Sequence, residues 1–346
     1  MWSNLIDRLE QGGRLTKEEW ITLLQNDNED FLSLLQERAR AVARARFGTG
    51  IFVRGLIEVS NYCRNNCYYC GIRSGNASVR RYRLNEESIL ACCRGGYTLG
   101  FRTFVLQGGE DPRQTDEFIT DVVQRIRNEF PDCAITLSLG EKSRASYERF
   151  FQAGANRYLL RHETYEDKHY RLLHPPGMLR EHRLQCLADL KDIGYQVGTG
   201  MMVGSPGQTL WDLAADLQFI QDFKPAMIGI GPFIPHHASP FAHEPAGSLQ
   251  QTLKLLALLR LMHPAALIPS TTALATLSPK GRIQGILSGA NVVMPNLSPA
   301  TERKNYELYD EKAALGAESA EGLSILQQEL SAVGYHIDYS RGDYQI

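Results

Sequence analysis

The residues best suited to carry chemistry are three cysteines in one short segment. Cys63, Cys67 and Cys70 form the pattern Cys-x₃-Cys-x₂-Cys. Thiolates are soft ligands for iron–sulfur clusters, and three of them on a tight loop suit a [4Fe–4S] cluster with one iron left open to a small molecule. A zinc site or three unlinked buried cysteines are the alternatives. Zinc requires a fourth ligand, however, and no His or Cys follows at a usual finger spacing.

The other cysteines give no sign of a second metal site. Cys92, Cys93, Cys133 and Cys186 are expected to be buried small apolar residues. An odd total of seven in a long chain indicates reduced thiols or metal ligands rather than a disulfide framework. Because no cysteine follows Cys186, we expect one cluster and no second one.

Composition narrows the class of protein. Of the 346 residues 43% are apolar and 22% are charged, as in ordinary globular proteins. The 37 basic and 39 acidic residues give a net charge of −2, so we expect neither nucleic-acid nor membrane binding. No apolar run approaches the roughly 18 residues of a membrane span. Asp7, Arg8 and Glu10 interrupt the N-terminal segment, which excludes a signal-peptide core and predicts a cytoplasmic protein.

Short apolar runs alternate with helical stretches and must position the cysteine loop. The expected strands are residues 51–59, 103–107, 134–139, 157–161, 197–203, 227–231, 267–271 and 291–294. The expected helices between them are residues 86–99, 116–129, 143–152, 181–193, 210–222, 249–261 and 281–287. Such alternation predicts parallel βαβ units and a complete (β/α)₈ TIM barrel. A doubly wound open sheet is the structural alternative, but its Gly-x-Gly-x-x-Gly fingerprint is missing.

The chain then divides into three parts. Residues 1–48 are expected to form an N-terminal helical extension, with a capping box from Thr16 to Glu19. Residues 49–308 are expected to form the barrel, and residues 309–346 a C-terminal extension with a closing helix (321–333) and a loop. Cys63 follows the end of the first strand, the end of a barrel at which βα loops carry the chemistry.

A first strand followed by Cys-x₃-Cys-x-aromatic-Cys, with Tyr69 as the aromatic residue, resembles the radical S-adenosylmethionine (SAM) superfamily. The resemblance implies that the open iron binds SAM and that Tyr69 lies near its adenine. It also implies a one-electron donor of the ferredoxin or flavodoxin type, whose electron cleaves SAM to a 5′-deoxyadenosyl radical. Residues 107–112 look like the superfamily's Gly-Gly-Glu-Pro element, so Gly109 and Glu110 are expected to contact the SAM ammonium group. An ordinary glycine-rich turn is the alternative for that segment.

Within the superfamily, about residues 3–310 resemble the HydE family of FeFe-hydrogenase maturases. The matching stretches are residues 105–112, 135–141, 157–164, 229–236, 268–273 and 289–296. The resemblance implies a role, beside other hydrogenase maturases, in building the diiron subcluster of the hydrogenase active site. The implied substrate is a small cysteine-bound iron complex with carbonyl and cyanide ligands, handed over by a partner maturase.

The same resemblance implies the residues of the site. SAM contacts are implied at Ser138, Glu163 and Arg183. The implied substrate pocket is lined by Thr136, Arg161, Met227, Thr271, Thr272 and Tyr306. Hydroxyl groups at strand ends supply directional hydrogen bonds, and an arginine offers a fork for a carboxylate or cyanide. The alternatives are simple β-propensity for the Thr271–Thr272 pair and a solvated loop mouth for residues 161–164.

The chain departs from the pattern of the HydE family at two points, and three other functions are alternatives to that of a maturase. Gly108 stands where the family often has Ser, and the second cluster of some members has no ligands here. The rivals are a radical mutase of the methylornithine synthase type, a sulfur insertase like biotin synthase, which needs a second cluster, and a non-catalytic iron–sulfur carrier.

His236 and His237 are expected in a loop at the barrel mouth. A basic stretch is expected to be either solvated or a docking site for an acidic electron donor; its residues are Arg73, Arg80, Arg81 and Arg83.

Overall fold

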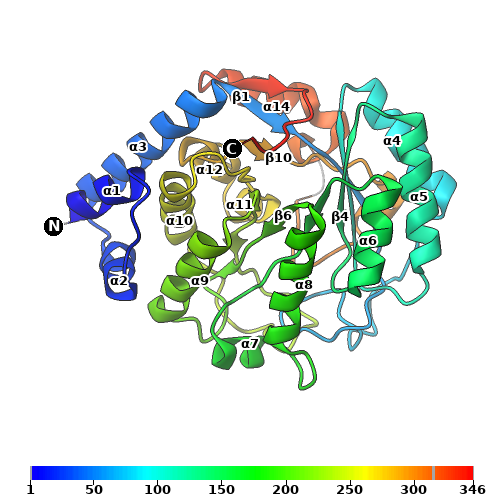
Figure 1. Ribbon diagram of the computed structural model, residues 1–346, viewed down its shortest axis with the longest axis horizontal. Helices are drawn as coiled ribbons and strands as arrows, with labels where there is room; N and C mark the ends of the chain where they lie inside the picture. Colours follow the sequence, from blue (N-terminus) through cyan, green and yellow to red (C-terminus); the bar gives the residue numbers. More distant parts are fainter. Residues whose placement is uncertain (1, 314–315, 346) are drawn as a thin grey trace.

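The N-terminal helices are capped locally and packed through one apolar face. The computed structural model describes residues 2–313 and 316–345. It begins with α1 (Trp2–Glu10), α2 (Lys17–Gln25) and α3 (Glu29–Phe47). Thr16 and Glu19 make the capping box that the sequence predicts. Trp20 and Phe31 are buried in the same cluster as residues of α9 (Leu210–Phe223) and α10 (Leu249–Met262), so these helices cover one side of the molecule (Figure 1).

A parallel sheet surrounded by helices forms the body of the molecule. Its main part has the order β2-β3-β4-β5-β6-β8. The bounds are β2 (Gly55–Ser60), β3 (Thr103–Gly108), β4 (Ala134–Ser138), β5 (Arg157–Leu159), β6 (Gln196–Thr199) and β8 (Met227–Ile228). These strands are almost wholly buried, because helices cover the outer face, and the parallel order confirms the predicted βαβ units.

The covering helices follow the strands in turn. They are α4 (Glu86–Thr98), α5 (Asp116–Glu129), α6 (Arg144–Ala153), α7 (Asp167–Leu173) and α8 (Arg180–Ile193), followed after α10 by α11 (Thr272–Leu277), α12 (Gly281–Leu287) and α13 (Ala300–Arg303). Several begin with a polar side chain that accepts an N–H of the first turn: Asn85, Thr115, Ser143, Thr209 and Ser248. Gly154 and Gly194 end α6 and α8 in the left-handed conformation, as expected of helices that lead into strands.

The strands do not make one regular sheet of eight. The predicted first strand is divided into β1 (Gly50–Val53) and β2, and β1 pairs instead with β10 (Val292–Val293). Residues 197–203 and 227–231 are likewise divided, leaving a separate pair of β7 (Met202–Val203) and β9 (Gly231–Pro232). Residues 267–271 make only isolated bridges, at Leu267 and Pro269. The described residues therefore confirm a parallel α/β fold but not the complete eight-stranded barrel that the sequence predicts.

Glycine and proline account for the later breaks, those in residues 197–203, 227–231 and 267–271. A Cβ on Gly200 would lie 1.9 Å from the carbonyl oxygen of Gly229, so the two segments approach too closely for side chains where they bend. Pro269 has no N–H to donate to a neighbouring strand. The period of apolar residues predicts where a strand begins, but these two features interrupt it.

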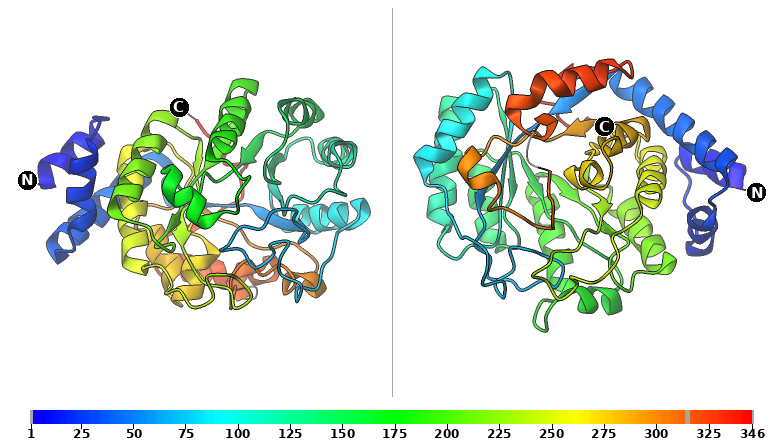
Figure 2. Two further views of the ribbon diagram at one scale, coloured as in Figure 1. Left: turned by 90° about the horizontal axis from the view of Figure 1, so that it is seen from below. Right: turned by 180° about the vertical axis from the view of Figure 1, so that it is seen from behind.

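The C-terminal extension contains a strand that the sequence does not predict. After the turns η1 (Gly316–Glu318) and η2 (Ala320–Gly322), the expected closing helix is α14 (Leu323–Ser331), two residues shorter at each end than predicted. The expected loop includes β11 (His336–Asp338), which pairs in parallel with β1. Arg157, at the start of β5, donates to the carbonyl oxygens of Arg341 and Gly342, so the tail covers the end of the sheet where strands begin. The orange-red segment beside β1 shows this arrangement (Figure 2).

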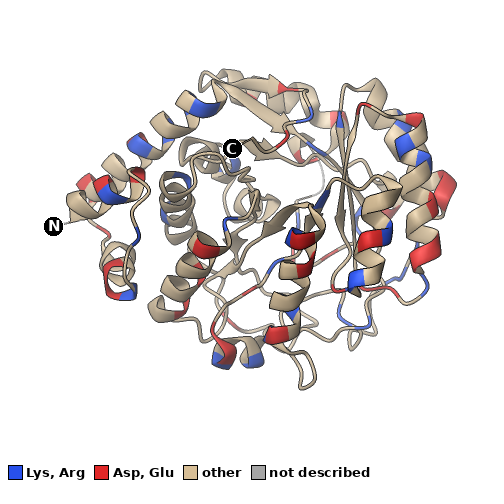
Figure 3. Ribbon diagram, viewed as in Figure 1, with Lys and Arg blue, Asp and Glu red and all other residues tan. Residues whose placement is uncertain are grey.

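Charged residues are spread over the surface rather than gathered. In one view of the molecule, basic and acidic residues are interspersed along α5, α6 and α8 (Figure 3). Many form exposed ion pairs, such as Arg94 with Glu129, which contribute little stability singly. Among the described helices none is long and apolar enough to cross a membrane.

Candidate active site at the carboxyl ends of the strands

The three cysteines of the predicted cluster lie on the loop that follows β2. Backbone hydrogen bonds fold this loop: the Cys70 N–H donates to the Cys67 carbonyl at 3.2 Å, and the Tyr68 N–H to the Leu173 carbonyl at 3.0 Å. All three side chains are partly buried. The loop therefore presents three thiols from one tight segment, as the spacing predicts.

Their protonation fits metal binding. Burial raises the pKa of the Cys63 thiol and raises that of Cys67 well above its ordinary value. Burial, reinforced by the charge of Cys63, raises the pKa of Cys70 to about 12. Without metal the thiols are therefore protonated at neutral pH, and metal binding must displace their protons. Bound cluster iron would stabilise the three deprotonated thiols side by side.

The end of β3 approaches the cysteine loop closely. A Cβ on Gly109 would lie 2.3 Å from the Tyr62 carbonyl oxygen and 2.7 Å from Cβ of Cys63. Glycine is therefore required at this position. This approach places the Gly-Gly-Glu element directly against the cysteine loop, and its contact with the SAM ammonium group stays a prediction.

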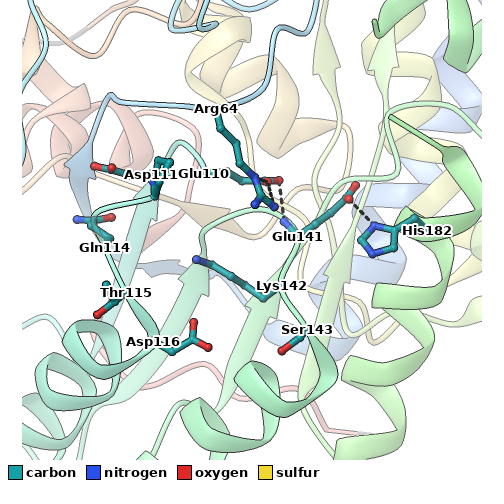
Figure 4. Close-up of a pocket in the computed structure, with 11 residues that line it drawn as sticks. Arg64, Glu110, Asp111, Gln114, Thr115, Asp116, Glu141, Lys142, Ser143 and His182 are labelled. Carbon is teal, nitrogen blue, oxygen red and sulfur yellow. Dashed lines mark hydrogen bonds and ion pairs between the residues drawn. The ribbon is translucent and has the colours of Figure 1, made fainter. Parts of the chain in front are cut away.

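Glu110 has a protein donor on each carboxylate oxygen. Arg64 Nε donates to Oε2 at 3.0 Å, and the Glu141 N–H donates to Oε1 at 2.8 Å. These residues line a cavity of about 490 Å³ that also receives Lys142 and His182 (Figure 4). Asp111 and Pro112, which follow Glu110, also line this cavity.

Several polar atoms at the strand ends are buried without a hydrogen-bond partner. They are Oγ1 of Thr136, Nε and Nη2 of Arg161, Oε2 of Glu163 and Oγ1 of Thr271. Arg161 Nη2 lies 3.0 Å from Glu163 Oε2, but in an orientation that makes no hydrogen bond. Buried polar groups are almost always partnered in folded proteins. Four predicted site residues thus share the property expected of side chains that await a polar ligand.

The backbone at Glu163 is held in an uncommon conformation. Its φ of 65° is in the left-handed region, which is unfavourable for a residue with a side chain. The Glu163 N–H donates to the Gly200 carbonyl, and the Met202 N–H donates to the Glu163 carbonyl. Such conformations persist where surrounding contacts fix them, and they are frequent at functional sites.

Three predicted SAM residues have the following contacts. Arg183 is buried on α8, pairs with Glu141 and donates Nη1 to the Arg161 carbonyl at 2.8 Å. Removal of Arg183 would leave the half-buried Glu141 without this partner, and the contact of Arg183 with SAM stays a prediction. Ser138 ends β4 and is partly buried. Tyr69 lies 3.3 Å from His174 Nε2 through its hydroxyl.

The tautomer of His174 fixes the direction of that last hydrogen bond. Nδ1 of His174 lies 2.9 Å from the Tyr170 carbonyl oxygen, which can only accept. Burial lowers the pKa of His174 to about 4, so the ring is neutral at pH 7. Nδ1 therefore carries the proton, and the Tyr69 hydroxyl donates to Nε2. This bond orients the aromatic ring of the cysteine loop.

The remaining predicted substrate residues already have protein partners. The Thr272 hydroxyl donates to Glu318 at 2.7 Å, and Gln107 Nε2 donates to the Tyr306 hydroxyl at 3.5 Å. Met227 is buried, with Sδ 3.0 Å from Nη1 of Arg54.

Arg54 is a residue that the sequence reasoning missed. It is buried, its Nε has no partner, and burial together with nearby Arg157 places its pKa well below the ordinary value. Burying the charge of an arginine inside an otherwise apolar strand costs free energy, and this feature of the sequence could have marked Arg54.

His236 and His237 lie close to a third potential ligand, Asp310. Among the described residues these three form the group whose ligand atoms are close enough for one ion. However, Nδ1 of His236 accepts the Ala238 N–H at 3.0 Å, so Nε2 carries the proton and cannot coordinate. The pair thus lies in a loop that contacts the C-terminal segment, and it is no metal site in this arrangement.

Comparison with known proteins agrees with the fold and the cysteine loop. The family model described as Radical SAM superfamily matches residues 57–220. The structure superposes on methylornithine synthase (PylB) with a TM-score of 0.85 and 27% identity, covering 96% of this chain and 97% of that one. It superposes on the FeFe-hydrogenase maturase HydG from Carboxydothermus hydrogenoformans with a TM-score of 0.80 over 98% of this chain and 79% of that one; at 23% identity this shows the fold alone.

Sequence relatives extend over most of the chain. The [FeFe] hydrogenase maturase subunit HydE of Thermotoga maritima is 43% identical over 308 residues, which are 89% of this chain and 87% of that protein. The 3-methylornithine synthase of Methanosarcina acetivorans is 29% identical over 307 residues, 88% of this chain and 86% of that one. The chain therefore belongs to the radical SAM superfamily of enzymes and, within it, to the family of HydE. Membership confirms the predicted class and implies a [4Fe–4S] cluster and SAM.

Proposed function

We propose that the chain acts in assembly of the diiron active-site subcluster of FeFe hydrogenase, with other maturases and a one-electron donor of the ferredoxin or flavodoxin type as partners. The observation that carries this proposal is the set of buried, unpartnered polar atoms at the strand ends, in a chain 43% identical to a hydrogenase maturase subunit. Bound cluster and SAM would together supply a 5′-deoxyadenosyl radical. We propose that its target is a small cysteine-bound iron complex.

In this proposal one group of residues holds the cofactors. Cys63, Cys67 and Cys70 bind the single cluster, and the ring of Tyr69, oriented by His174, lies near the adenine. The other SAM-binding residues are Gly109, Glu110, Ser138, Glu163 and Arg183. Glu110 would accept a hydrogen bond from the SAM ammonium group, in addition to the one from Arg64 or in its place. Glu163, whose Oε2 makes no hydrogen bond in the protein, has acceptor capacity for the SAM ribose hydroxyls.

A second group holds the substrate. Thr136, Arg161 and Thr271 supply unpartnered donors, while Met227, Thr272 and Tyr306 shape the space around them. Radical reactions depend on the position of the target atom more than on acid–base groups. The tail over the opposite end of the sheet would help to exclude water.

The reduced, reconstituted protein is expected to form 5′-deoxyadenosine from SAM and to replace HydE in a hydrogenase maturation assay. The measurement is product by chromatography together with hydrogen evolution by the matured hydrogenase. Turnover without hydrogenase activation, but with conversion of lysine to methylornithine, would favour the mutase, which the similarity to methylornithine synthases makes the second candidate. Absence of turnover would favour the iron–sulfur carrier.

Glu163→Gln is expected to weaken SAM binding about tenfold, because a charged acceptor contributes roughly 1.5–3 kcal/mol through its hydrogen bonds and the amide retains part of that. The exchange keeps size and backbone conformation, so the melting temperature should stay near that of the wild type. Calorimetric titration with SAM and thermal unfolding check both points. A collapsed melting temperature with unchanged SAM affinity would make Glu163 a structural residue.

A further inference from the structure

One arginine of the predicted basic stretch is turned inward, toward the cysteine loop. The terminal nitrogens of Arg81 donate to four backbone carbonyls, those of Asn61, Ile72, Arg73 and Asn76. The distance is 2.7 Å from Nη1 to the Ile72 oxygen and 2.7 Å from Nη2 to the Arg73 oxygen. Asn61 precedes the first cysteine and the other three follow the last one. A single guanidinium thus joins both ends of the segment that carries the three thiols.

The charge of Arg81 has no carboxylate partner in the described part of the chain, unlike its neighbours. Arg64 pairs with Glu110, and Arg83 pairs with Asp111. Burial lowers the pKa of Arg81, and Cys63 and Cys70 are the first groups that oppose this. In return, the charge of Arg81 partly offsets the effect of burial on the pKa of both thiols. Asn61 lies two residues before Cys63 and Ile72 two residues after Cys70, so these hydrogen bonds hold the charge of Arg81 beside the cysteine loop.

For Arg81, though not for exposed Arg80, this placement disagrees with both sequence interpretations of the basic stretch. A solvated Arg81 would not make four hydrogen bonds to main-chain oxygens, and an arginine that docks an acidic partner must have its donors free. A planar fork with five donors can hold several carbonyls in fixed positions, whereas an ammonium group cannot reach them all. The geometry suits a residue that shapes the loop.

We propose that Arg81 is a positioning residue of the cluster: it fixes the conformation of the cysteine loop, and its uncompensated positive charge makes the cluster easier to reduce. The inference rests on the proposed binding of the cluster by Cys63, Cys67 and Cys70. Reduction adds one negative charge to the cluster, so a nearby positive charge stabilises the reduced form. Net charge and hydrogen bonding around a cluster are what set its potential.

The test compares three variants as reconstituted full-length proteins. Arg81→Met removes both the positive charge and the guanidinium donors, and Arg81→Lys keeps the charge without the planar set of donors. Arg80→Met is the control, because Arg80 is exposed on the same stretch. Potentials are measured by redox titration followed by electron paramagnetic resonance without SAM, and cluster retention by iron release to a chelator.

Arg81→Met should lower the ratio of reduced to oxidised cluster about tenfold at a fixed potential, a negative shift of about 59 mV for one electron. Arg81→Lys should keep the wild-type potential yet release iron several-fold faster. Arg80→Met should match the wild type in both. An unchanged potential in Arg81→Met overturns the role of the charge, and wild-type iron release in Arg81→Lys overturns the positioning role.

Two further outcomes remain decisive. If Arg81→Met takes up no iron while its circular dichroism and melting temperature stay normal, the positioning role is supported, and Arg81→Gln against Arg81→Lys then tests the charge. If Arg81→Met does not fold, the iron release and potential of Arg81→Lys decide between the two roles. A cluster that survives replacement of all three cysteines would instead overturn the ligand assignment, independently of Arg81.

Discussion

Replacing Cys63, Cys67 and Cys70 together with alanine is expected to reduce bound iron from about four per chain to none, because it removes the three thiolates that are proposed to hold the cubane. Their thiols lie on one loop, and burial raises the pKa of each, so only metal binding makes three thiolates favourable there. Iron analysis and electron paramagnetic resonance after anaerobic reconstitution measure the effect. SAM cleavage should be lost with the iron.

Cys92→Ala is the matched control for this experiment. Cys92 is half-buried on α4, outside the segment that carries the three predicted ligands. The variant should keep its iron. Four irons retained by the triple variant would contradict the ligand assignment, and roughly six in the wild type would reveal a second cluster, which the cysteine distribution does not predict.

Thr271→Val is expected to reduce hydrogenase maturation by up to about one hundredfold, because one buried hydrogen bond to a polar substrate is worth roughly 1–3 kcal/mol. Its Oγ1 is buried without a partner in the protein, and valine keeps the shape while removing the hydroxyl. Iron content and SAM affinity should remain those of the wild type. The measurement is hydrogen evolution by matured hydrogenase at equal protein concentration.

Thr272→Val provides the contrast that the neighbouring residue offers. Its hydroxyl donates to Glu318, which also pairs with Arg282, so its loss should lower the melting temperature rather than abolish maturation. Wild-type activity in Thr271→Val would remove Thr271 from the substrate pocket. Equal loss of activity in both variants at unchanged stability would instead assign the substrate to the pair, as the resemblance implies.

Features fixed by local spacing were predictable from the sequence. Three cysteines at i, i+4 and i+7 must share one loop whatever the rest of the chain does, and their spacing suffices to indicate a cluster. The Thr16 capping box acts within a few residues and is found where predicted, and the glycines that end α6 and α8 act equally locally. Buried parallel strands follow likewise from apolar runs of strand length. The resemblance to the superfamily rests on the cysteine spacing after a first strand.

Contacts between distant segments were decided only by the tertiary structure. The pairing of β11 with β1 joins residues nearly 300 positions apart, and the interruption of the sheet depends on how closely Gly200 approaches Gly229. Sequence patterns likewise cannot tell whether a polar side chain has a partner, and that separates unpartnered Thr271 from Thr272, or inward-turned Arg81 from exposed Arg80. The physical reason is that a polar group's role depends on which donors and acceptors surround it, and these come from elements that only folding brings together.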